Sequence, residues 1–271
     1  DPRNFADFVK VMQKYPPQIF KGVNTLFNAL MNTPGFERID FSRLVGSVGG
    51  GMAVQAAVAE RWKKLTGCPL SQGWGLTETS PVVTVCKLQG EEFNGSVGLP
   101  IPSTEVSIRD DGGGEMGINE VGEICVRGPQ VMAGYWQRPE ETANVMLPEG
   151  WLKTGDIGRV DERGYVFIED RKKDMISVSG FKVYPNEVED VAVRIPGVFE
   201  AAAIAEPDEH SGEVVALYVV LKDPNVTAEQ IIAFMRQHLT SYKVPRRVYF
   251  RKELPKSNVG KILRRSLRDG G

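Results

Sequence analysis

A strand, a run of glycines, a helix and a second strand follow one another early in the chain, and this order constrains the fold more than any other feature. Residues 44–48 form a short apolar run of strand length that leads into three glycines at 49–51. Residues 53–65 have the composition of a helix, and Gly67 lies where a C-cap glycine would end it. Residues 68–72 then return as a strand. This order predicts a βαβ unit, in which ligands bind where the parallel strands end.

The start of the chain also has a helical pattern. Apolar side chains recur with helical spacing at Phe5, Phe8, Val9 and Met12. The helix must end before Pro16 and Pro17, because proline cannot continue a helix. The first residue is Asp1 rather than Met, so we expect the chain to be a fragment of a longer protein.

The pattern changes after about residue 95. Short alternating runs separated by Gly and Asp predict an antiparallel β-subdomain, and they occupy residues 105–109, 122–127 and 164–168. A charged stretch at 169–174 follows. Beyond it, helical and strand-like segments alternate at residues 186–193, 201–205, 214–221 and 228–239.

These patterns predict a chain of mixed α/β and α+β class with two domains. The larger domain would span residues 1–169, with the βαβ portion at about 1–90 and the β-subdomain at about 91–169. A charged linker would occupy residues 170–174. A small α+β domain would span residues 175–271.

Charge and composition argue against several classes of function. The 33 Lys and Arg residues are balanced by 35 Asp and Glu residues, and the net charge of -2 gives no basic field for binding nucleic acid. Two histidines leave little material for a zinc site or a His-based triad. Three widely separated cysteines without a C-x-x-C spacing indicate a reducing, cytoplasmic compartment. The longest apolar run, residues 214–221, is too short to span a membrane.

Residues 73–80 directly follow the predicted βαβ unit and form a candidate binding loop. Gly73 and Gly75 would let the backbone approach a ligand closely. Thr77 offers a hydroxyl, and Glu78 offers a carboxylate that could ligate Mg2+ beside a phosphate. The alternative is an ordinary glycine-rich turn.

Three further segments are candidates for chemistry. Residues 151–156 end in Gly-Asp, and Asp156 would accept hydrogen bonds from ribose hydroxyls, although a plain β-turn is the commoner interpretation. Residues 255–262 form a basic loop that is not a Walker A loop, and Lys261 would either contact a phosphate or be a solvated lysine. Residues 179–182 match the S-x-x-K of serine acylases, but the accompanying motifs of that class are missing, so we interpret the match as coincidence.

The remaining charged candidates are expected at the surface. We interpret Arg264, Arg265 and Arg268 as the solvated face of a terminal helix. His210 and His238 lie among polar residues and are expected to be exposed.

Five motifs follow one another along the chain: GWGLTETSP at 73–81, GEICVRGPQVMAGYW at 122–136, WLKTGDIG at 151–158, DRKKDMISVSGFKVYPNEVE at 170–189 and LPKSNVGKILRR at 254–265. In sequence and spacing, the series resembles the core motifs of the acyl-adenylate-forming superfamily, which contains acyl-CoA synthetases, luciferases and peptide-synthetase adenylation domains. The resemblance covers essentially the whole chain and is strongest to bacterial long-chain fatty acyl-CoA synthetases. It implies a fragment of an ATP-dependent long-chain fatty acid:CoA ligase, which forms acyl-AMP and then the CoA thioester.

The resemblance also implies catalytic roles. Thr77 would contact the α-phosphate of ATP, and Glu78 would hold Mg2+. Lys261 would bridge the carboxylate of the fatty acid and the α-phosphate during adenylation. Lys173 matches the hinge about which the small domain rotates, and Gly180 matches the loop that passes the pantetheine arm of CoA.

Further residues would bind the nucleotide. By resemblance, Asp156 and Arg171 would hold the ribose hydroxyls of ATP or AMP. Trp74 stands where relatives usually carry a tyrosine packed on adenine, so stacking should be preserved. The remaining contacts implied are Gly50, Gly51, Met52, Gly73 and Gly75.

One motif of the superfamily is missing, namely its Ser/Thr/Gly-rich phosphate loop. We therefore expect the isolated chain to be inactive in adenylation. Two alternatives stay open: a ligase for an aryl or medium-chain acid, and a non-catalytic module that binds AMP or a partner. The resemblance further implies peripheral membrane association of the full-length enzyme.

Overall fold

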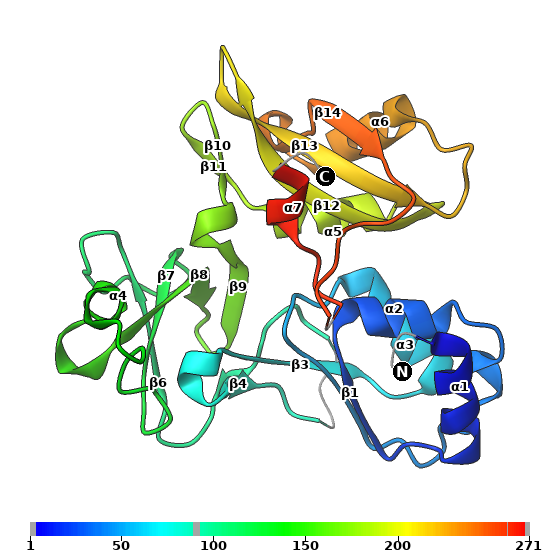
Figure 1. Ribbon diagram of the computed structural model, residues 1–271, viewed down its shortest axis with the longest axis horizontal. Helices are drawn as coiled ribbons and strands as arrows, with labels where there is room; N and C mark the ends of the chain where they lie inside the picture. The colour runs from blue at the N-terminus through cyan, green and yellow to red at the C-terminus, as the bar shows by residue number, and fades with distance from the viewer. Residues whose placement is uncertain (1–3, 89–92, 259, 269–271) are drawn as a thin grey trace. The chain divides into compact units, whose positions relative to one another are not determined.

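The structure is a computed structural model that describes residues 4–88, 93–258 and 260–268 (Figure 1). The chain divides into two compact units, Asp1–Ile168 and Glu169–Gly271. The sequence-based boundary near residue 90 lies outside the described residues. Each unit has its own apolar clusters.

A five-stranded sheet in the order β1-β2-β3-β4-β5 opens the first unit. Its strands are β1 (Ile19–Gly22), β2 (Gly46–Gly49), β3 (Leu70–Gly75), β4 (Val82–Val85) and β5 (Leu99–Pro100). β1, β2 and β3 are parallel, and α3 (Ala56–Thr66) connects β2 to β3. Gly67 ends α3 with a φ of 74°. The predicted βαβ unit is confirmed.

Aromatic packing fixes helices of this unit to its first sheet. Besides α3, the helices at this sheet are α1 (Phe5–Lys14) and α2 (Asn24–Met31), and α1 confirms the helix predicted at the start of the chain. Trp62 of α3 is fully buried, with its ring 5.5 Å from that of Phe20 and 4.8 Å from that of Phe27. Its indole N–H donates to the Ser47 Oγ of β2 at 2.9 Å. Trp62 therefore fixes α3 against α2, β1 and β2.

A second sheet, in the order β6-β7-β8-β9, completes the first unit. Its strands are β6 (Glu105–Arg109), β7 (Gly122–Arg127), β8 (Leu152–Val160) and β9 (Val166–Arg171), and α4 (Pro139–Val145) precedes β8. The antiparallel pairing of β6 with β7 and of β7 with β8 agrees with the predicted β-subdomain.

The segment 151–156 was interpreted from sequence as more typical of a turn, and this is wrong. The segment enters β8, which pairs with β7 on both sides of a register shift. Gly155 lies at this shift with a φ of 71°, which indicates a β-bulge that takes up the extra residues. The Gly-Asp pair therefore belongs to a bulged strand, which re-aims the Asp156 side chain.

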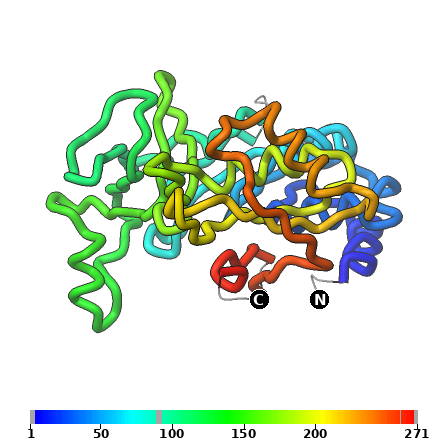
Figure 2. Tube along the Cα trace, turned by 90° about the horizontal axis from the view of Figure 1, so that it is seen from above, coloured from blue at the N-terminus to red at the C-terminus, as the bar shows by residue number. Residues whose placement is uncertain are grey.

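The second unit contains a sheet in the order β11-β10-β13-β12, with β14 also paired to β13. Its strands are β10 (Ile176–Val178), β11 (Phe181–Val183), β12 (Val198–Asp208), β13 (Gly212–Leu221) and β14 (Arg247–Phe250). Its helices are α5 (Pro185–Val193), α6 (Ala228–His238) and α7 (Arg264–Arg268). The long β12–β13 hairpin is the yellow segment in Figure 2.

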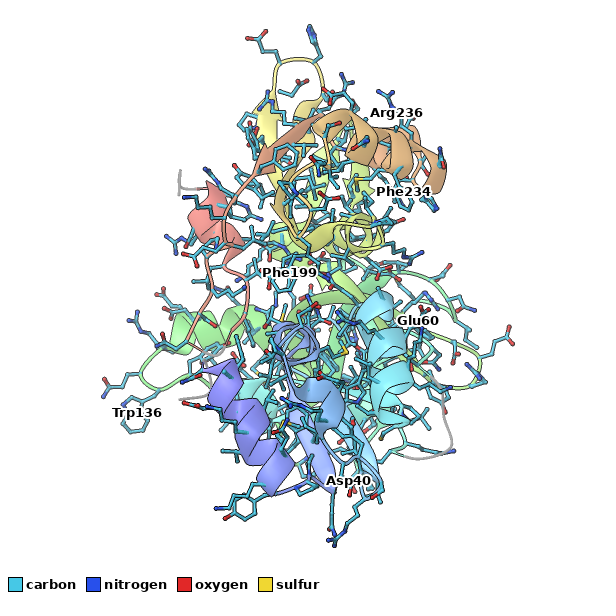
Figure 3. The ribbon with its side chains drawn as sticks, turned by 90° about the vertical axis from the view of Figure 1, so that its right-hand side faces the viewer. Asp40, Glu60, Trp136, Phe199, Phe234 and Arg236 are labelled. Carbon is cyan, nitrogen blue, oxygen red and sulfur yellow. The ribbon has the colours of Figure 1, made fainter. Side chains whose placement is uncertain are left out.

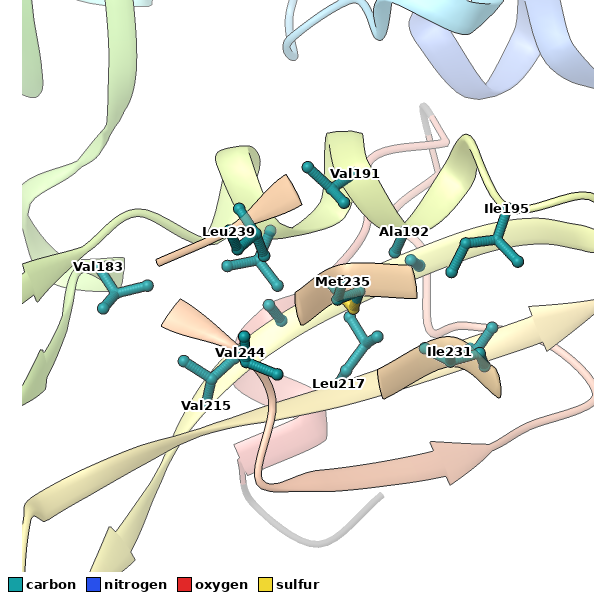
Figure 4. Packing of buried hydrophobic residues seen from close by; sticks show 14 of the residues in the cluster. Val183, Val191, Ala192, Ile195, Val215, Leu217, Ile231, Met235, Leu239 and Val244 are labelled. Atoms are coloured by element: carbon teal, nitrogen blue, oxygen red, sulfur yellow. The ribbon is translucent and has the colours of Figure 1, made fainter. Parts of the chain in front are cut away.

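β12 and β13 are buried on both faces. Ala203 and Leu217 belong to the cluster that includes residues of α5 and α6. Figure 4 shows Leu217 among other residues of this cluster. The alternate residues Ala202 and Ile204 belong to a second cluster, which includes Leu267 of α7. Because both faces are covered, these strands have continuous apolar sequences rather than alternating ones.

Candidate functional site

Residues 73–75 lie at the end of β3 and not in a loop, which corrects the sequence-based interpretation. They pair with β4, where Trp74 lies opposite Thr84. A Cβ atom on Gly75 would lie 1.7 Å from the carbonyl oxygen of Pro81. The close approach of two backbone segments therefore requires glycine at this position.

The turn that follows, η2 (Thr77–Thr79), is held together by Thr79. The Thr79 hydroxyl accepts a hydrogen bond from the Leu76 N–H at 3.0 Å and donates to the Pro81 carbonyl oxygen at 2.9 Å. Thr79 is fully buried, Thr77 is exposed and Glu78 is half-buried. Of three adjacent polar side chains, only Thr77 and Glu78 therefore remain accessible.

Tyr135 contacts Glu78 and was not singled out by sequence. Its hydroxyl donates to Glu78 Oε1 at 2.8 Å, and the Met132 N–H donates to the Glu78 carbonyl oxygen at 2.8 Å. The hydrogen bond to the carboxylate raises the pKa of Tyr135. Among the described residues, no group of three or more His, Cys, Asp or Glu side chains is arranged to hold a metal ion.

Trp74 and Asp156 are joined by a hydrogen bond across 82 residues of sequence. The Trp74 indole N–H donates to Asp156 Oδ2 at 2.8 Å. Asp156 is 4% exposed and lies beside Thr154, whose hydroxyl donates to the Ile124 carbonyl oxygen at 2.7 Å. The Trp74 ring packs against an apolar cluster from β4, β6 and β7. The structure thus brings together two residues that the resemblance assigned to different parts of a nucleotide.

Gly50, Gly51 and Met52 follow β2, next to the end of β1. The Gly50 N–H donates to the last carbonyl oxygen of β1 at 3.0 Å, and Gly51 has a φ of 76°. Gln72 fixes the next turn, because its Oε1 accepts the Val54 N–H at 3.1 Å. This polar support from Gln72 was not predicted from the sequence.

In the second unit, Lys261 lies close to Ser257, another residue of the predicted basic loop. The Ser257 N–H donates to the Lys261 carbonyl oxygen at 2.8 Å. Lys256 forms an antiparallel bridge across the loop, and its Nζ lies 2.7 Å from Oε2 of Glu200, a buried carboxylate on β12. Lys261 is half-buried, and its backbone is thereby tied to the sheet.

Arg264 is not a solvated residue, contrary to the sequence-based expectation. Its side chain is 17% exposed and donates two hydrogen bonds to Glu189, at 3.0 and 2.8 Å. The same guanidinium lies 3.6 Å from carboxylate oxygens of Asp170 and Asp174. Arg264, Asp170, Asp174 and Glu189 are called the Arg264 cluster below. The sequence pattern missed it because ion pairs between distant segments leave no local periodicity.

The cluster places a buried carboxyl group at the start of the predicted hinge. Asp170 is 1% exposed and accepts the N–H groups of Arg171 and Asn186, each at 2.7 Å. Burial raises the pKa of Asp170 to about 6, although the charge of Arg264 opposes this shift. Arg171 and Lys173 themselves are exposed.

Ser179 and Gly180 form the two-residue turn between β10 and β11. Their φ values of 50° and 82° are both positive, as in a type I′ hairpin turn. A Cβ atom on Gly180 would meet no atom within 4 Å. The S-x-x-K match therefore lies at the turn of a hairpin, and the space beside Gly180 is not filled by other atoms.

The predicted site residues divide between the two units. The first unit holds Gly50, Gly51, Met52, Gly73, Trp74, Gly75, Thr77, Glu78 and Asp156, and the second holds Arg171, Lys173, Gly180 and Lys261. Within the first unit, the structure joins Trp74 to Asp156. Within the second unit, the segment that includes Lys173 and the helix that follows Lys261 meet in the Arg264 cluster.

Two family models match the chain. One, described as AMP-binding enzyme, matches residues 1–136, and the other, described as AMP-binding enzyme C-terminal domain, matches residues 187–261. The chain is 56% identical over 269 residues to the long-chain-fatty-acid–CoA ligase of Escherichia coli O157:H7, covering 99% of this chain and 48% of that protein. It thus spans about half the length of the curated relatives it matches.

Solved structures agree with this similarity. An anthranilate CoA ligase, AuaEII, in complex with anthranoyl-AMP matches with a TM-score of 0.91 and 30% identity, over 99% of this chain and 52% of that one. ATP-bound MatB from Rhodopseudomonas palustris matches with a TM-score of 0.88 and 31% identity, over 99% and 53%. The predicted fold class is confirmed.

In the part of the chain that the structure describes, no helix combines the length and apolar character needed to cross a membrane.

Proposed function

We propose, because this chain belongs to the AMP-binding enzyme family, that it forms about half of an ATP-dependent ligase that joins a long-chain fatty acid to CoA. The observation that carries the proposal is the 56% identity, over 99% of this chain, to a long-chain-fatty-acid–CoA ligase. An aryl or medium-chain acid ligase and a non-catalytic module are less well supported, since relatives at 52–56% identity all have the long-chain name.

The reaction has two steps. The fatty acid carboxylate attacks the α-phosphorus of ATP, and pyrophosphate leaves to give acyl-AMP. The CoA thiol, after losing its proton, then attacks the acyl carbon, and AMP leaves. Lys261 would stabilise charge between the carboxylate and the α-phosphate in the first step, and Thr77, exposed on η2, would contact the α-phosphate.

Other residues would orient the substrates. Asp156 and Arg171 would hold the ribose hydroxyls, and the open side of Gly180 would let the pantetheine arm pass. The half-buried Glu78 offers one accessible carboxylate, which suits Mg2+ because this ion is usually held by one or two carboxylates together with phosphates and water. Bound there, Mg2+ would neutralise phosphate charge.

We further propose that residues 170–174 connect a larger domain, 1–169, to a small domain, 175–271, and act as a hinge at Lys173. The exposure of Arg171 and Lys173 supports this proposal. A cytoplasmic location is supported by three buried cysteines, none of which forms a disulfide in the described part of the chain. Peripheral membrane contact of the full-length ligase remains a proposal from the family resemblance and would be measured by sedimentation with anionic vesicles.

The test is ATP–pyrophosphate exchange by the full-length protein that contains this chain. We expect exchange with fatty acids in a ladder of increasing length, with the greatest kcat/KM for long chains. Exchange that depends only on aryl or short-chain acids would contradict the proposal, and so would a complete lack of exchange. The isolated chain should give only background exchange and should bind AMP weakly in calorimetry.

A further inference from the structure

The hydrogen bond between Trp74 and Asp156 gives the aromatic residue a second role. The Trp74 N–H donates to Asp156 Oδ2 at 2.8 Å. A carboxylate that is only 4% exposed requires hydrogen-bond donors, since burial without them is costly. The indole N–H of Trp74, which lies on β3, supplies one such donor to Asp156 on β8.

Both partners are held by their own surroundings. The Trp74 ring packs against an apolar cluster that includes Val83, Ile108 and Ile124, so the direction of its N–H is fixed. Asp156 lies in the β8 bulge, where its own N–H donates to the Thr154 hydroxyl at 3.1 Å. A rigid donor therefore meets a carboxylate on a rigid backbone, which is the condition for orienting that carboxylate.

We infer that Trp74 is a positioning residue for Asp156, which orients the carboxylate toward the ribose hydroxyls of the adenine nucleotide. The inference rests on the proposed function, and it goes beyond stacking on adenine. Tyrosine or phenylalanine at position 74 preserves an aromatic face but lacks the indole N–H. Trp74 therefore contributes to recognition of the sugar as well as the base.

The test separates the sugar from the base in AMP binding by the full chain. Titration calorimetry compares AMP with 2′,3′-dideoxy-AMP, which keeps the base and phosphate but lacks both hydroxyls. Trp74→Phe removes one hydrogen bond to a charged group and should weaken AMP binding about tenfold, which corresponds to about 1.4 kcal/mol. It should weaken binding of the dideoxy analogue less than binding of AMP, because phenylalanine still presents an aromatic face to the adenine.

Two controls support the comparison. Trp136 is 87% exposed and extends into solvent (Figure 3), so Trp136→Phe makes the same chemical change outside the site and should alter neither affinity. In an Asp156→Ala background, Trp74→Phe should weaken AMP binding no more than it weakens binding of the dideoxy analogue to the wild-type background, because the group it positions is already absent. This double-mutant cycle remains a valid comparison even if Trp74→Phe slightly lowers the folding stability of the chain.

Several other outcomes of these titrations would contradict the inference. Equal weakening of AMP and of the dideoxy analogue would assign Trp74 to stacking alone and overturn the inference. Unchanged AMP binding by Trp74→Phe would also overturn it, as would a loss of AMP affinity in the Asp156→Ala background as large as that in the wild-type background. A wild-type chain that binds no AMP would overturn the proposed nucleotide site itself, and the inference with it.

Discussion

Replacing Arg264 by methionine tests the Arg264 cluster directly. Methionine keeps an unbranched side chain but removes the charge that faces Glu189, Asp170 and Asp174. The side chains of Glu189 and Asp170 are 10% and 1% exposed, so they would stay buried without the guanidinium. Removing one partner of a buried ion pair costs about 3–5 kcal/mol. We expect the free energy of unfolding of the second unit to fall by about this amount at pH 8.

The loss should depend on pH because Asp170 titrates. Burial raises the pKa of folded Asp170 from 3.8 to about 6, so the folded chain binds this proton more tightly than the unfolded chain. The stability that this group contributes is full below pH 3.8 and is lost as the pH rises through about 6. Without Arg264 this pKa rises further. The difference between variant and wild type should therefore be smaller at pH 5 than at pH 8.

The chain offers a convenient assay. All four tryptophans lie in the first unit, at positions 62, 74, 136 and 151, so their fluorescence reports unfolding of that unit. Hydrogen exchange of the β12 and β13 amides reports the second unit. Arg264→Met should accelerate exchange in β12 and β13 and leave the fluorescence transition in urea unchanged.

Arg265→Met is the matched control, because Arg265 is an exposed neighbour. It should change stability by less than about 0.5 kcal/mol. The reasoning fails if the two variants behave alike, if Arg264→Met costs less than about 1 kcal/mol, or if its cost is the same at pH 5 and pH 8.

Three further predictions concern other parts of the chain. In the full-length protein, Lys261→Ala should lower acyl-AMP formation by several orders of magnitude but leave conversion of supplied acyl-AMP and CoA to thioester largely intact. Equal losses in both half-reactions would refute the role of Lys261 in adenylation. Gly75→Ala should destabilise the first unit by about 3 kcal/mol or more in urea titrations followed by fluorescence, because the added Cβ would lie 1.7 Å from a carbonyl oxygen. Gly73→Ala is the control: its added Cβ would lie 3.6 Å from the nearest atom, so it should cost less than about 1 kcal/mol. Limited trypsin digestion should cut first between Arg171 and Lys173 and release a stable second unit, and mass spectrometry that shows an earlier cut elsewhere would argue against the hinge.

Local patterns predicted most of the elements but few of the contacts between them. The βαβ unit was predictable because glycine-bounded apolar runs and a C-cap glycine act within a few residues. β8 was missed because its bulge places Gly155 and Asp156 inside a strand, and only pairing with β7 reveals this. Thr79 could not be told from Thr77, since the backbone turn alone decides which side chain is buried.

In the candidate site, too, single residues were predicted from the sequence but the contacts between them were not. The motifs identified Trp74 and Asp156 separately, but the hydrogen bond between them spans 82 residues and depends on the arrangement of two sheets. Arg264 was misplaced because its carboxylate partners lie near residues 170–189, far away in sequence. Such contacts follow from the tertiary fold, which the periodicity of a single segment does not specify.

The Arg264 cluster also limits how this chain can change over evolution. An apolar set of similar volume is often as stable as a buried ion-pair network, or more so. Reaching such a set by single substitutions, however, passes through chains in which a buried charge faces no counter-charge. Each of these intermediates would lose about 3–5 kcal/mol, a large part of the stability of an ordinary domain. Residues 170, 189 and 264 should therefore change together or not at all, and we expect them to covary among relatives.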